Sequence, residues 1–540
     1  MENKNFVDFT GGVNYVDSEL NMRDSYAVEA LNVELAYDST IKKRNGFKLV
    51  NNIHEYLLEN EKLQEIFYFE LKTILYTNQG RVLSMDDENT VEVIWDESIA
   101  QSISSETHIW GNPTERCFGT AAGSMFILSN GVNKPLQIDF HPNDPTAQKV
   151  QYLHDPGTGG NANVPIIYKA RMVNHYLCAA VLGSNTIHIS AKDVPGLWED
   201  DTEGAQAGAA SLNIDSIVGI PNQNIIDVAT YKNMLCIFTD YHIIIVELDV
   251  YVDRTEDGAT TQVHSPTVNM VVDNAGCATT GSVQSSLTSL LFLSVNGINS
   301  IERNAISTNF VPTSLSEKIL PFIKSKLSTE LFDTGVWSVV DRQKYVYMVK
   351  FLDNDMICMS FHPNLRFPCF YIWNNVKYKS FTTNVHGRVL CIDDYGVYIY
   401  TDNADGYCVD DHIDDEGTEY STLYSMEYET PWLFYGKPNN IKSMEYFNII
   451  SDGTAQFTVK AAFDVKREWE LQQDFIGGSM QGFGAGQNRY YGGGLISGTE
   501  NLCEFPQVFM YNKFRIESSD DRPLRIIRFG CFYNVGGIRR

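Results

Sequence analysis

Apolar and polar positions alternate in short runs along most of the chain, and the clearest example covers residues 227–247. Three largely apolar runs, Asp227–Tyr231, Met234–Thr239 and His242–Glu247, are separated there by two-residue polar breaks. Short runs rich in β-branched and aromatic side chains between turn residues are typical of strands. The pattern therefore predicts three consecutive antiparallel strands, which form a β-meander.

Similar meanders begin near positions 67, 117, 169, 282, 338 and 381, so the starts are 43 to 58 residues apart. A nearly regular period of this size indicates a repeat architecture with about 40–50 residues in each four-stranded unit. A radial arrangement buries both faces of such sheets and leaves only short edges. We therefore predict a mainly β protein in which residues 51–425 form a β-propeller-like domain of about six or seven blades. The alternative is a large β-sandwich with accidental spacing.

The pattern changes after residue 425, where four partly alternating runs predict strands exposed on one side. These runs are Met444–Ile450, Ala455–Phe463, Val508–Ile516 and Leu524–Tyr533. We expect residues 426–540 to form a C-terminal β-sandwich. A Gly-rich loop at 476–498 interrupts it, and its glycines have neither GxGxxG nor GxxxxGK spacing. We predict a mobile loop tip that offers a contact surface at Gly482, Phe483, Gly484 and Gly486.

Residues 1–50 are predicted to form a separate N-terminal unit. The pair Gly11–Gly12 suits a turn or a close backbone approach. We expect a short helix at Tyr26–Leu31, capped by Ser25, and a hairpin-like segment from Val33. The basic run 42–46 is interpreted as a solvated turn, with a phosphate site as the alternative.

Three further stretches have specific predictions. The run from Leu315 predicts a helix that Ser314 or Ser316 caps, and the polar stretch Asp249–Val268 predicts a loop. The acidic run 410–416 lacks the spacing of a calcium loop, so a solvated loop is expected. The stretch Ser190–Trp198 differs in every interval from the sialidase Asp box, and it predicts a blade-edge turn with a packed tryptophan.

The net charge of −27 argues against a protein that holds nucleic acid by its phosphates, because such binding relies on clustered lysine and arginine. Two interpretations stay open. One is an ordinary acidic surface of a cytoplasmic protein, and the other is a surface that lies near nucleic acid without binding it.

The ten cysteines show no CxxC spacing, and several lie in apolar strands, so buried free thiols are expected. The chain starts without the apolar run of a signal peptide, and its longest apolar runs are too short to cross a bilayer. We also find no GxSxG or HExxH motif. We therefore expect a non-enzymatic protein without metal or cofactor, although paired carboxylates for glycoside hydrolysis leave no sequence signature.

Motifs along nearly the whole chain, the Gly-rich insert at 477–498 excepted, resemble in order the tail nozzle proteins of short-tailed bacteriophages, also called tail tubular protein B or tail hub proteins. The opening FTGGVN from Phe9, the segment around Asn32 and KKRNGF from Lys42 begin this resemblance. It continues through motifs within the predicted propeller and sandwich. These are NGVNKPLQID from Asn130, SAKDVPGLW from Ser190, GCATTGSV from Gly276, LFLSVNGI from Leu291, SEKI from Ser316 and the stretch Lys513–Tyr533.

The resemblance implies a virion protein that forms a hexameric ring below the portal and adaptor and conducts the genome during ejection. Its expected partners are copies of itself, adaptor proteins, and tail fibres or distal tail proteins, and double-stranded DNA would pass without specific binding. Assembly would take place in the cytoplasm of the host bacterium, with no membrane insertion by this chain. Docking to neighbouring subunits or the adaptor is expected at the N-terminal positions Phe9, Gly11, Gly12, Asn32, Arg44 and Gly46.

Deletion of residues 1–50 is accordingly expected to abolish ring assembly and to leave the propeller folded. The main alternative is a glycan-binding or glycan-hydrolysing β-propeller, which would carry carboxylates, or arginine and tryptophan, at the axial end of the propeller. A generic propeller scaffold for host complexes is a third possibility.

Overall fold

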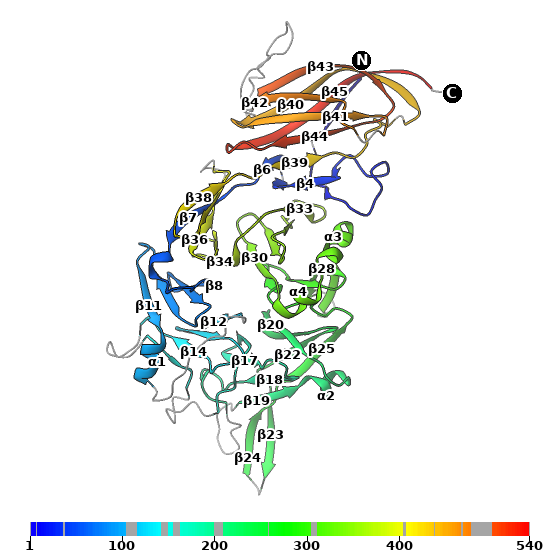
Figure 1. Cartoon of the computed structure of the whole chain (residues 1–540). Coiled ribbons are helices and arrows are strands. Elements are labelled where there is room, and N and C mark those ends of the chain that lie inside the picture. Colours follow the sequence, from blue (N-terminus) through cyan, green and yellow to red (C-terminus); the bar gives the residue numbers. More distant parts are fainter. Residues whose placement is uncertain are drawn as a thin grey trace.

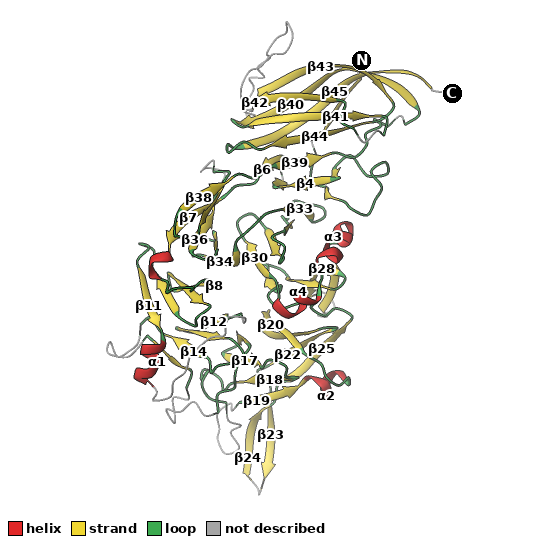
Figure 2. Cartoon of the chain, in the orientation of Figure 1, coloured by secondary structure: helices red, strands yellow, loops and turns green. Residues whose placement is uncertain are grey.

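The computed structural model describes residues 2–538, apart from 7, 36–37, 104–115, 142–148, 155–162, 199–208, 257–258, 304–309, 403–406, 437, 466–467 and 477–498. Strands dominate this part of the chain, and the helices are few and short (Figure 2). The molecule is elongated, with a sandwich of long strands at one end and a ring of short sheets at the other (Figure 1).

The ring is a β-propeller with seven four-stranded blades among the described residues. Blade one consists of β8 (Leu63–Phe69), β9 (Lys72–Thr77), β10 (Val82–Met85) and β11 (Val91–Trp95). Blade two consists of β12 (Phe118–Ala122), β13 (Met125–Ser129), β14 (Leu136–Ile138) and β15 (Val150–Tyr152). Blade three consists of β16 (Lys169–Val173), β17 (Tyr176–Ala180), β18 (Thr186–Ile189) and β19 (Ala210–Asn213). The predicted period is thereby confirmed as a blade repeat.

Blades four to seven follow the same antiparallel order. Blade four consists of β20 (Ile225–Tyr231), β21 (Met234–Thr239), β22 (His242–Glu247) and β25 (Thr267–Asp273), and blade five of β26 (Gln284–Ser285), β27 (Leu290–Ser294), β28 (Gly297–Arg303) and β29 (Phe310–Ser314). Blade six consists of β30 (Trp337–Asp341), β31 (Val346–Lys350), β32 (Met356–Ser360) and β33 (Cys369–Trp373). Blade seven consists of β34 (Lys379–Thr383), β35 (Val389–Ile392), β36 (Gly396–Tyr400) and β7 (Phe47–Asn52). The first strands contact one another around the ring, and β34 meets β8 to close it.

The last strand of blade seven comes from the N-terminal segment. β7 pairs antiparallel with β36, and Leu49 lies opposite Tyr398. The predicted boundary between residues 50 and 51 therefore falls inside a propeller strand. Blade seven is incomplete without β7, so the structure argues against a propeller that folds without residues 1–50.

Blade four carries an inserted hairpin, β23 (Tyr251–Glu256) and β24 (Ala259–His264), between β22 and β25. The hairpin projects from the propeller at the end remote from the sandwich (Figure 1). The expected loop at Asp249–Val268 is thus wrong for most of its length, because its two halves pair with each other as strands.

The C-terminal sandwich is confirmed as two layers, each of which includes N-terminal strands. One layer has the order β43-β40-β45-β6-β5, with β1 on β45, and the other contains β4-β39-β44-β41-β42. The strands are β1 (Glu2–Phe6), β4 (Glu29–Leu31), β5 (Val33–Leu35), β6 (Ile41–Lys43), β39 (Met426–Glu429), β40 (Asn440–Gly453), β41 (Gln456–Phe463), β42 (Leu471–Ile476), β43 (Thr499–Phe509), β44 (Asn512–Ser518) and β45 (Leu524–Ile538). The predicted single strand Val508–Ile516 is instead split by a turn at 510–511 between β43 and β44.

One continuous nine-stranded sheet joins the sandwich to the propeller. Its β33, the outer strand of blade six, pairs with β4, and β4 pairs in turn with β39. The helix expected at Tyr26–Leu31 is therefore wrong: this stretch forms β4 and β3 (Tyr26–Ala27), and β3 pairs with β2 (Gly12–Val13). Strand partners far away in the sequence outweighed a weak local helix preference.

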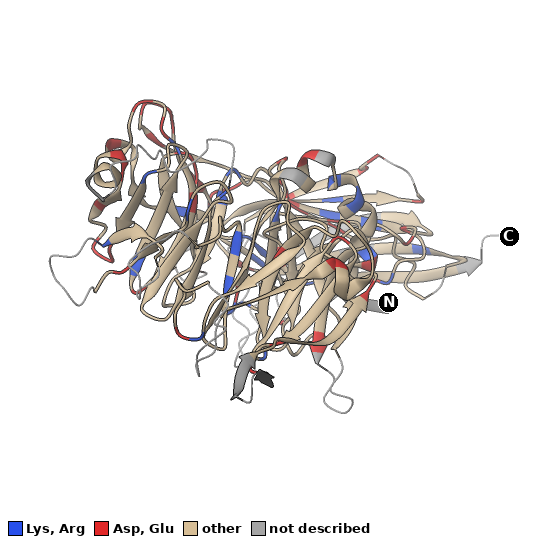
Figure 3. Cartoon of the chain, turned by 90° about the horizontal axis from the view of Figure 1, so that it is seen from below, with Lys and Arg blue, Asp and Glu red and all other residues tan. Residues whose placement is uncertain are grey.

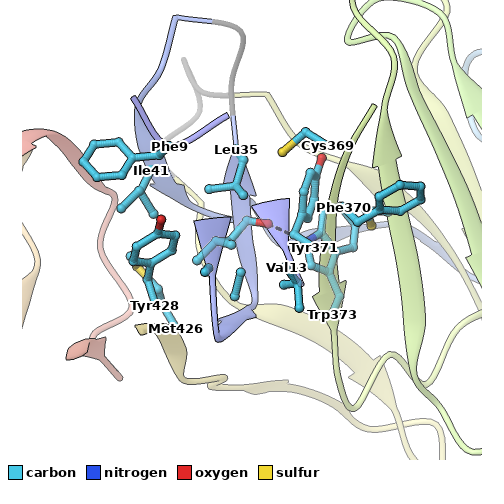
Figure 4. Close-up of a cluster of buried hydrophobic side chains, with 14 of the residues drawn as sticks. Phe9, Val13, Leu35, Ile41, Cys369, Phe370, Tyr371, Trp373, Met426 and Tyr428 are labelled. Atoms are coloured by element: carbon cyan, nitrogen blue, oxygen red, sulfur yellow. Dashed lines mark hydrogen bonds between the residues drawn. The ribbon is translucent and has the colours of Figure 1, made fainter. Parts of the chain in front are cut away.

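The largest hydrophobic cluster fills this junction. Phe9, Val13 and Leu35 of the N-terminal segment are at most 3% exposed. Figure 4 shows Leu35 between the aromatic side chains of β33 and the residues Met426 and Tyr428 of β39. Because the N-terminal segment fills the space between propeller and sandwich, it does not form a separate unit.

The helices lie at the edges of the propeller (Figure 2). They are η1 (His54–Tyr56), α1 (Glu97–Ile103), α2 (Ile214–Val218), η2 (Glu317–Ile319), α3 (Leu320–Lys326) and α4 (Thr329–Thr334). The helix predicted after Leu315 is present as η2 and α3, but Ser316 does not cap it. The hydroxyl of Ser316 accepts a hydrogen bond from the backbone N–H of Ile298 at 2.7 Å instead.

The remaining hairpin, β37 (Asp410–Ile413) and β38 (Glu419–Thr422), contains the acidic run 410–416. The expected solvated loop is wrong for the start of this run, because Asp410 is only 3% exposed. The packed tryptophan at the end of Ser190–Trp198 is confirmed, since Trp198 packs on the hydrophobic cluster between blades two and three.

Candidate functional site

The first strands of the blades enclose a small pocket of about 150 Å³ at the propeller axis. Its lining includes charged and aromatic side chains that stand at or next to the beginning of successive first strands. The lining residues used below are Glu65, Arg116, Phe118, Lys169, Arg171, Gln284, Trp337 and Ser380. We call this space the axial pocket.

One ion pair joins blades three and four beside the axial pocket. The ammonium group of Lys169 donates a hydrogen bond to the carboxylate of Asp227, and both side chains are almost fully buried. Asp227 also accepts a hydrogen bond from the backbone N–H of Gly281 at 3.2 Å. The pair therefore ties three neighbouring blades together at their inner ends.

A second ion pair joins blades one and two. Arg116 Nε lies 2.7 Å from Glu65 Oε1, and Arg116 Nη1 donates to the carbonyl oxygen of Val336 at 2.6 Å. The guanidinium also lies over the Trp337 ring, 5.0 Å from its centroid. The Phe118 ring stands between the two cations, 5.3 Å from Arg116 Cζ and 4.7 Å from Lys169 Nζ. Aromatic faces thus contribute to the stabilisation of both charges.

Burial dominates the electrostatics of the axial pocket. It lowers the pKa of Lys169 to about 8, against the opposing effect of Asp227. It also lowers the pKa of Arg171 and raises the pKa of the Cys117 thiol well above its ordinary value. A thiol that stays protonated is a poor nucleophile.

Glycoside hydrolysis needs a carboxylic acid and a second carboxylate beside the substrate. At the axial pocket, Glu65 and Asp227 are instead each bound to a cation.

The residues predicted for docking lie elsewhere, in the junction between propeller and sandwich. Phe9 is 2% exposed, and its ring stacks on Phe529 at 5.5 Å between centroids. A Cβ on Gly11 or Gly12 would lie 2.5 Å from the backbone of Ser25 or Phe370. Phe9 and Gly12 are therefore inside the folded chain, whereas Gly11 is partly exposed and docking at that position stays a prediction.

Arg44 forms the polar centre of this junction. Its guanidinium is fully buried and forms a bidentate ion pair with Asp410, with Nη1 3.0 Å from Oδ1. Its Nε donates to Asn32 Oδ1 at 3.2 Å, and the group lies 3.5 Å from the centroid of the Tyr424 ring. The interpretation of the run 42–46 as a solvated turn is therefore wrong. A full set of partners allows this charge to be buried.

Gly46 and Asn32 fit the same junction for backbone reasons. A Cβ on Gly46 would lie 1.7 Å from the carbonyl oxygen of Val409, so only glycine allows these two segments of the backbone to approach each other so closely. Asn32 has a φ of 50°, and its side-chain amide donates to Ser425 O at 2.8 Å. The predicted loop-tip residues Gly482, Phe483, Gly484 and Gly486 lie outside the described residues.

Sequence reasoning missed the axial pocket, although a signal was present. Charged residues stand at or next to the start of four consecutive repeats, at Glu65, Arg116, Lys169 and Asp227. Propeller geometry brings these starts to one axis, so a charge that recurs at this position of the repeat indicates an axial cluster.

The cysteines, and the described residues that could ligate a metal, lie as follows. Nine of the ten cysteines are described in side-chain detail, and all nine are buried free thiols, as predicted. Within the described ranges, no three or more His, Cys, Asp or Glu side chains are grouped so that they could hold a metal ion. None of the helices in those ranges has the length and apolar character needed to cross a bilayer.

Comparison with known proteins gives matches of structure alone. No family model and no curated protein sequence matches the chain. Among solved structures, the β-propeller domain of Cps50 (Swd1) from Myceliophteria thermophila is 8% identical with a TM-score of 0.39, and the alignment covers 63% of this chain and 97% of that one. BamB from Moraxella catarrhalis is 10% identical with a TM-score of 0.34, over 63% and 83%. The computationally designed Ika8 protein is 8% identical with a TM-score of 0.35, over 66% and 100%.

Proposed function

We propose that this chain is the subunit of a ring-shaped tail nozzle or hub of a short-tailed bacteriophage. Below the portal and adaptor, the ring would conduct the genome and anchor other tail parts without catalysis. The ordered motifs of the N-terminal segment, propeller and sandwich support this role. The observation that carries it is the nine-stranded sheet from β30 to β42, which joins propeller and sandwich into one elongated subunit.

The axial pocket bears on where DNA would pass in the proposed ring. It is lined by ion pairs and aromatic rings and holds about 150 Å³, far less than a duplex needs. The DNA channel of the proposed assembly therefore lies between subunits, at the centre of a ring that closes by rotation. Each contact in such a ring joins two different faces of adjacent subunits.

The acidic composition is compatible with a channel that does not hold DNA. A net charge of −27 opposes binding to phosphates, and an electronegative lumen lets DNA slide. Figure 3 shows Asp and Glu on many separate loops rather than in a single patch. Carboxylates are thus available on several faces that a ring could turn toward its lumen.

The glycan-binding alternative receives less support from the geometry. Arg116 and Trp337 do meet at the axis, as that alternative requires, but their polar groups already bind Glu65 and Val336. The pocket is also smaller than the 300–1,000 Å³ of common ligand sites.

Negative-stain electron microscopy of the concentrated, mildly crosslinked full-length protein tests the proposal. We expect six-fold rings with a central channel that is wide enough for a DNA duplex. A protein that remains monomeric both alone and with isolated portal–adaptor complexes would contradict the proposal. In that case, binding to a glycan array would favour the alternative.

A further inference from the structure

Arg171 differs from Arg116 and Lys169 because none of the described carboxylates lies at ion-pair distance from it, although the charge of Asp227 acts on it from farther away. It lies on β16 two residues after Lys169, so both side chains point to the same face of the strand. Its Nη1 donates to the carbonyl oxygens of Gly119 at 3.2 Å and Ala170 at 3.4 Å. Among the residues that the structure describes, these carbonyls are its acceptors, although a guanidinium carries five N–H donors.

The charges around the axial pocket do not balance. Arg116, Lys169 and Arg171 supply three cationic groups, whereas Glu65 and Asp227 supply two carboxylates. Both carboxylates are already engaged, by Arg116 and Lys169. A half-buried cation without a carboxylate at ion-pair distance is less favourable than a paired one, and a bound anion would supply the missing counter-charge.

Arg171 is accessible in spite of its position. The side chain is half-buried, faces the axial pocket and is surrounded by the first strands. Polar groups from other blades share this pocket. Gln284 already donates from its amide nitrogen to the carbonyl oxygen and the hydroxyl of Ser338, so it is not assigned to the anion. The Ser380 hydroxyl accepts a hydrogen bond from Ile66 N at 3.0 Å. The hydroxyl hydrogen of Ser380 can therefore be donated to a ligand.

We infer that the axial pocket binds one small oxyanion, such as phosphate, sulfate or a single carboxylate, on the guanidinium of Arg171. The planar fork of arginine matches two oxygens of such an anion. About 150 Å³ accommodates one group of this size and excludes a nucleotide or an oligosaccharide. The bound anion neutralises the excess charge and adds a polar contact between blades at the axis.

Thermal unfolding of the full-length protein tests this site with inorganic phosphate as the probe. Phosphate is titrated at pH 7 against sodium chloride of equal ionic strength, and sulfate and acetate are tested in the same way. We expect a saturable rise in Tm with at least one oxyanion and no such rise with chloride, because a ligand of the native state stabilises it. The oxyanion with the largest rise identifies the preferred class.

Two variants locate the site. Arg171→Gln should abolish the saturable rise, whereas Arg342→Gln removes the same charge from an exposed turn between β30 and β31 and should retain it. An equal rise in Arg171→Gln overturns the assignment. If Arg171→Gln does not fold, Arg171→Lys, which keeps the charge without the planar fork, should weaken binding at least tenfold. Equilibrium dialysis of the wild-type protein that shows no saturable binding of any of the three oxyanions also overturns it.

Discussion

At the scale of single residues, burial of charge depends on a complete set of partners. Arg44 was expected in water because three basic residues follow one another in the sequence. In the fold it is fully buried, because Asp410, Asn32 and the Tyr424 ring together replace the water around its guanidinium. Since this set joins the N-terminal segment to β37, its loss should weaken the junction between sandwich and propeller.

Replacement of Arg44 by methionine should destabilise the protein by about 3–5 kcal/mol, because it leaves the buried Asp410 without its counter-charge. Denaturant unfolding measures this cost. Arg388→Met is the matched control, since its pair with Asp402 is largely exposed and should contribute at most about 1 kcal/mol. Similar losses for the two variants would show that Asp410 is accessible to water.

Glu29 on β4 provides a test with a defined pH dependence. Burial raises its pKa, and the neighbouring Glu427 and Glu429 raise it further, against the hydrogen bond from Tyr15. The folded state therefore takes up this proton at a higher pH than the unfolded state, so the contribution of Glu29 to stability increases as the pH falls. Glutamine at this position keeps an acceptor for Tyr15 and removes the half-buried charge.

We expect Glu29→Gln to be at least as stable as the wild type at pH 7.5 and to lose this relative advantage as the pH approaches 4.5. Urea unfolding of both proteins across this range measures the difference. Glu88→Gln, on an exposed turn, should show no comparable trend. An advantage for Glu29→Gln that grows toward acid pH would contradict the raised pKa.

At the scale of elements, the donated strand β7 and the inserted hairpin β23–β24 differ in how far the propeller depends on them. β7 completes blade seven from a position more than 300 residues before β36, so the propeller ring depends on it. The hairpin β23–β24 instead projects from blade four, and its two ends join the blade next to each other. At its base, Ser265 N donates to Val250 O at 2.9 Å, so the two ends of the insertion are already close.

Removal of residues 1–52 should therefore prevent stable folding of the propeller, since it deletes β7 and the N-terminal part of the main hydrophobic cluster. Replacement of residues 251–263 by two glycines should leave the fold intact, because it keeps the buried His264, whose ring stacks on Tyr176. Circular dichroism, thermal melting and limited proteolysis distinguish the two variants. A stable propeller without residues 1–52 would restore the interpretation of this segment as a separate docking unit.

At the scale of the whole molecule, the nine-stranded sheet and the shared core couple the sandwich to the propeller. Residues of β4, β33 and β39 belong to one hydrophobic cluster together with the inner faces of the sandwich. The two parts cannot separate without exposure of that cluster to water, which costs about 25 cal/mol per Å² of apolar surface.

Differential scanning calorimetry should consequently show that the sandwich and at least the adjoining blades unfold in a single transition. Ala30→Asp, which buries a carboxylate at a fully buried position of β4, should lower that transition and broaden or divide it. The hairpin deletion serves as the control and should leave one transition. Two well-separated transitions in the wild-type protein would contradict the coupling.

The sequence by itself determined the features that depend on neighbouring residues. The apolar meanders and their spacing predicted the blades, because the alternation of strand and turn is local. Repeat starts at 67, 117, 169, 227, 282, 338 and 381 each fall within three residues of a blade's first strand. The buried cysteines and the helix after Leu315 were predicted on the same local basis.

Only the tertiary structure decided which distant segments meet. Asp410 lies 366 residues from Arg44, and no local pattern in the run 42–46 indicates that a carboxylate covers it. For the same reason, Glu29–Leu31 was predicted as helix, although its strand partners Ile372 and Tyr428 settle its conformation. The axial pocket arises because ring closure brings the starts of seven blades to one axis. Hydrogen bonding and burial depend on these long-range neighbours, which is why the site emerged only from the folded chain.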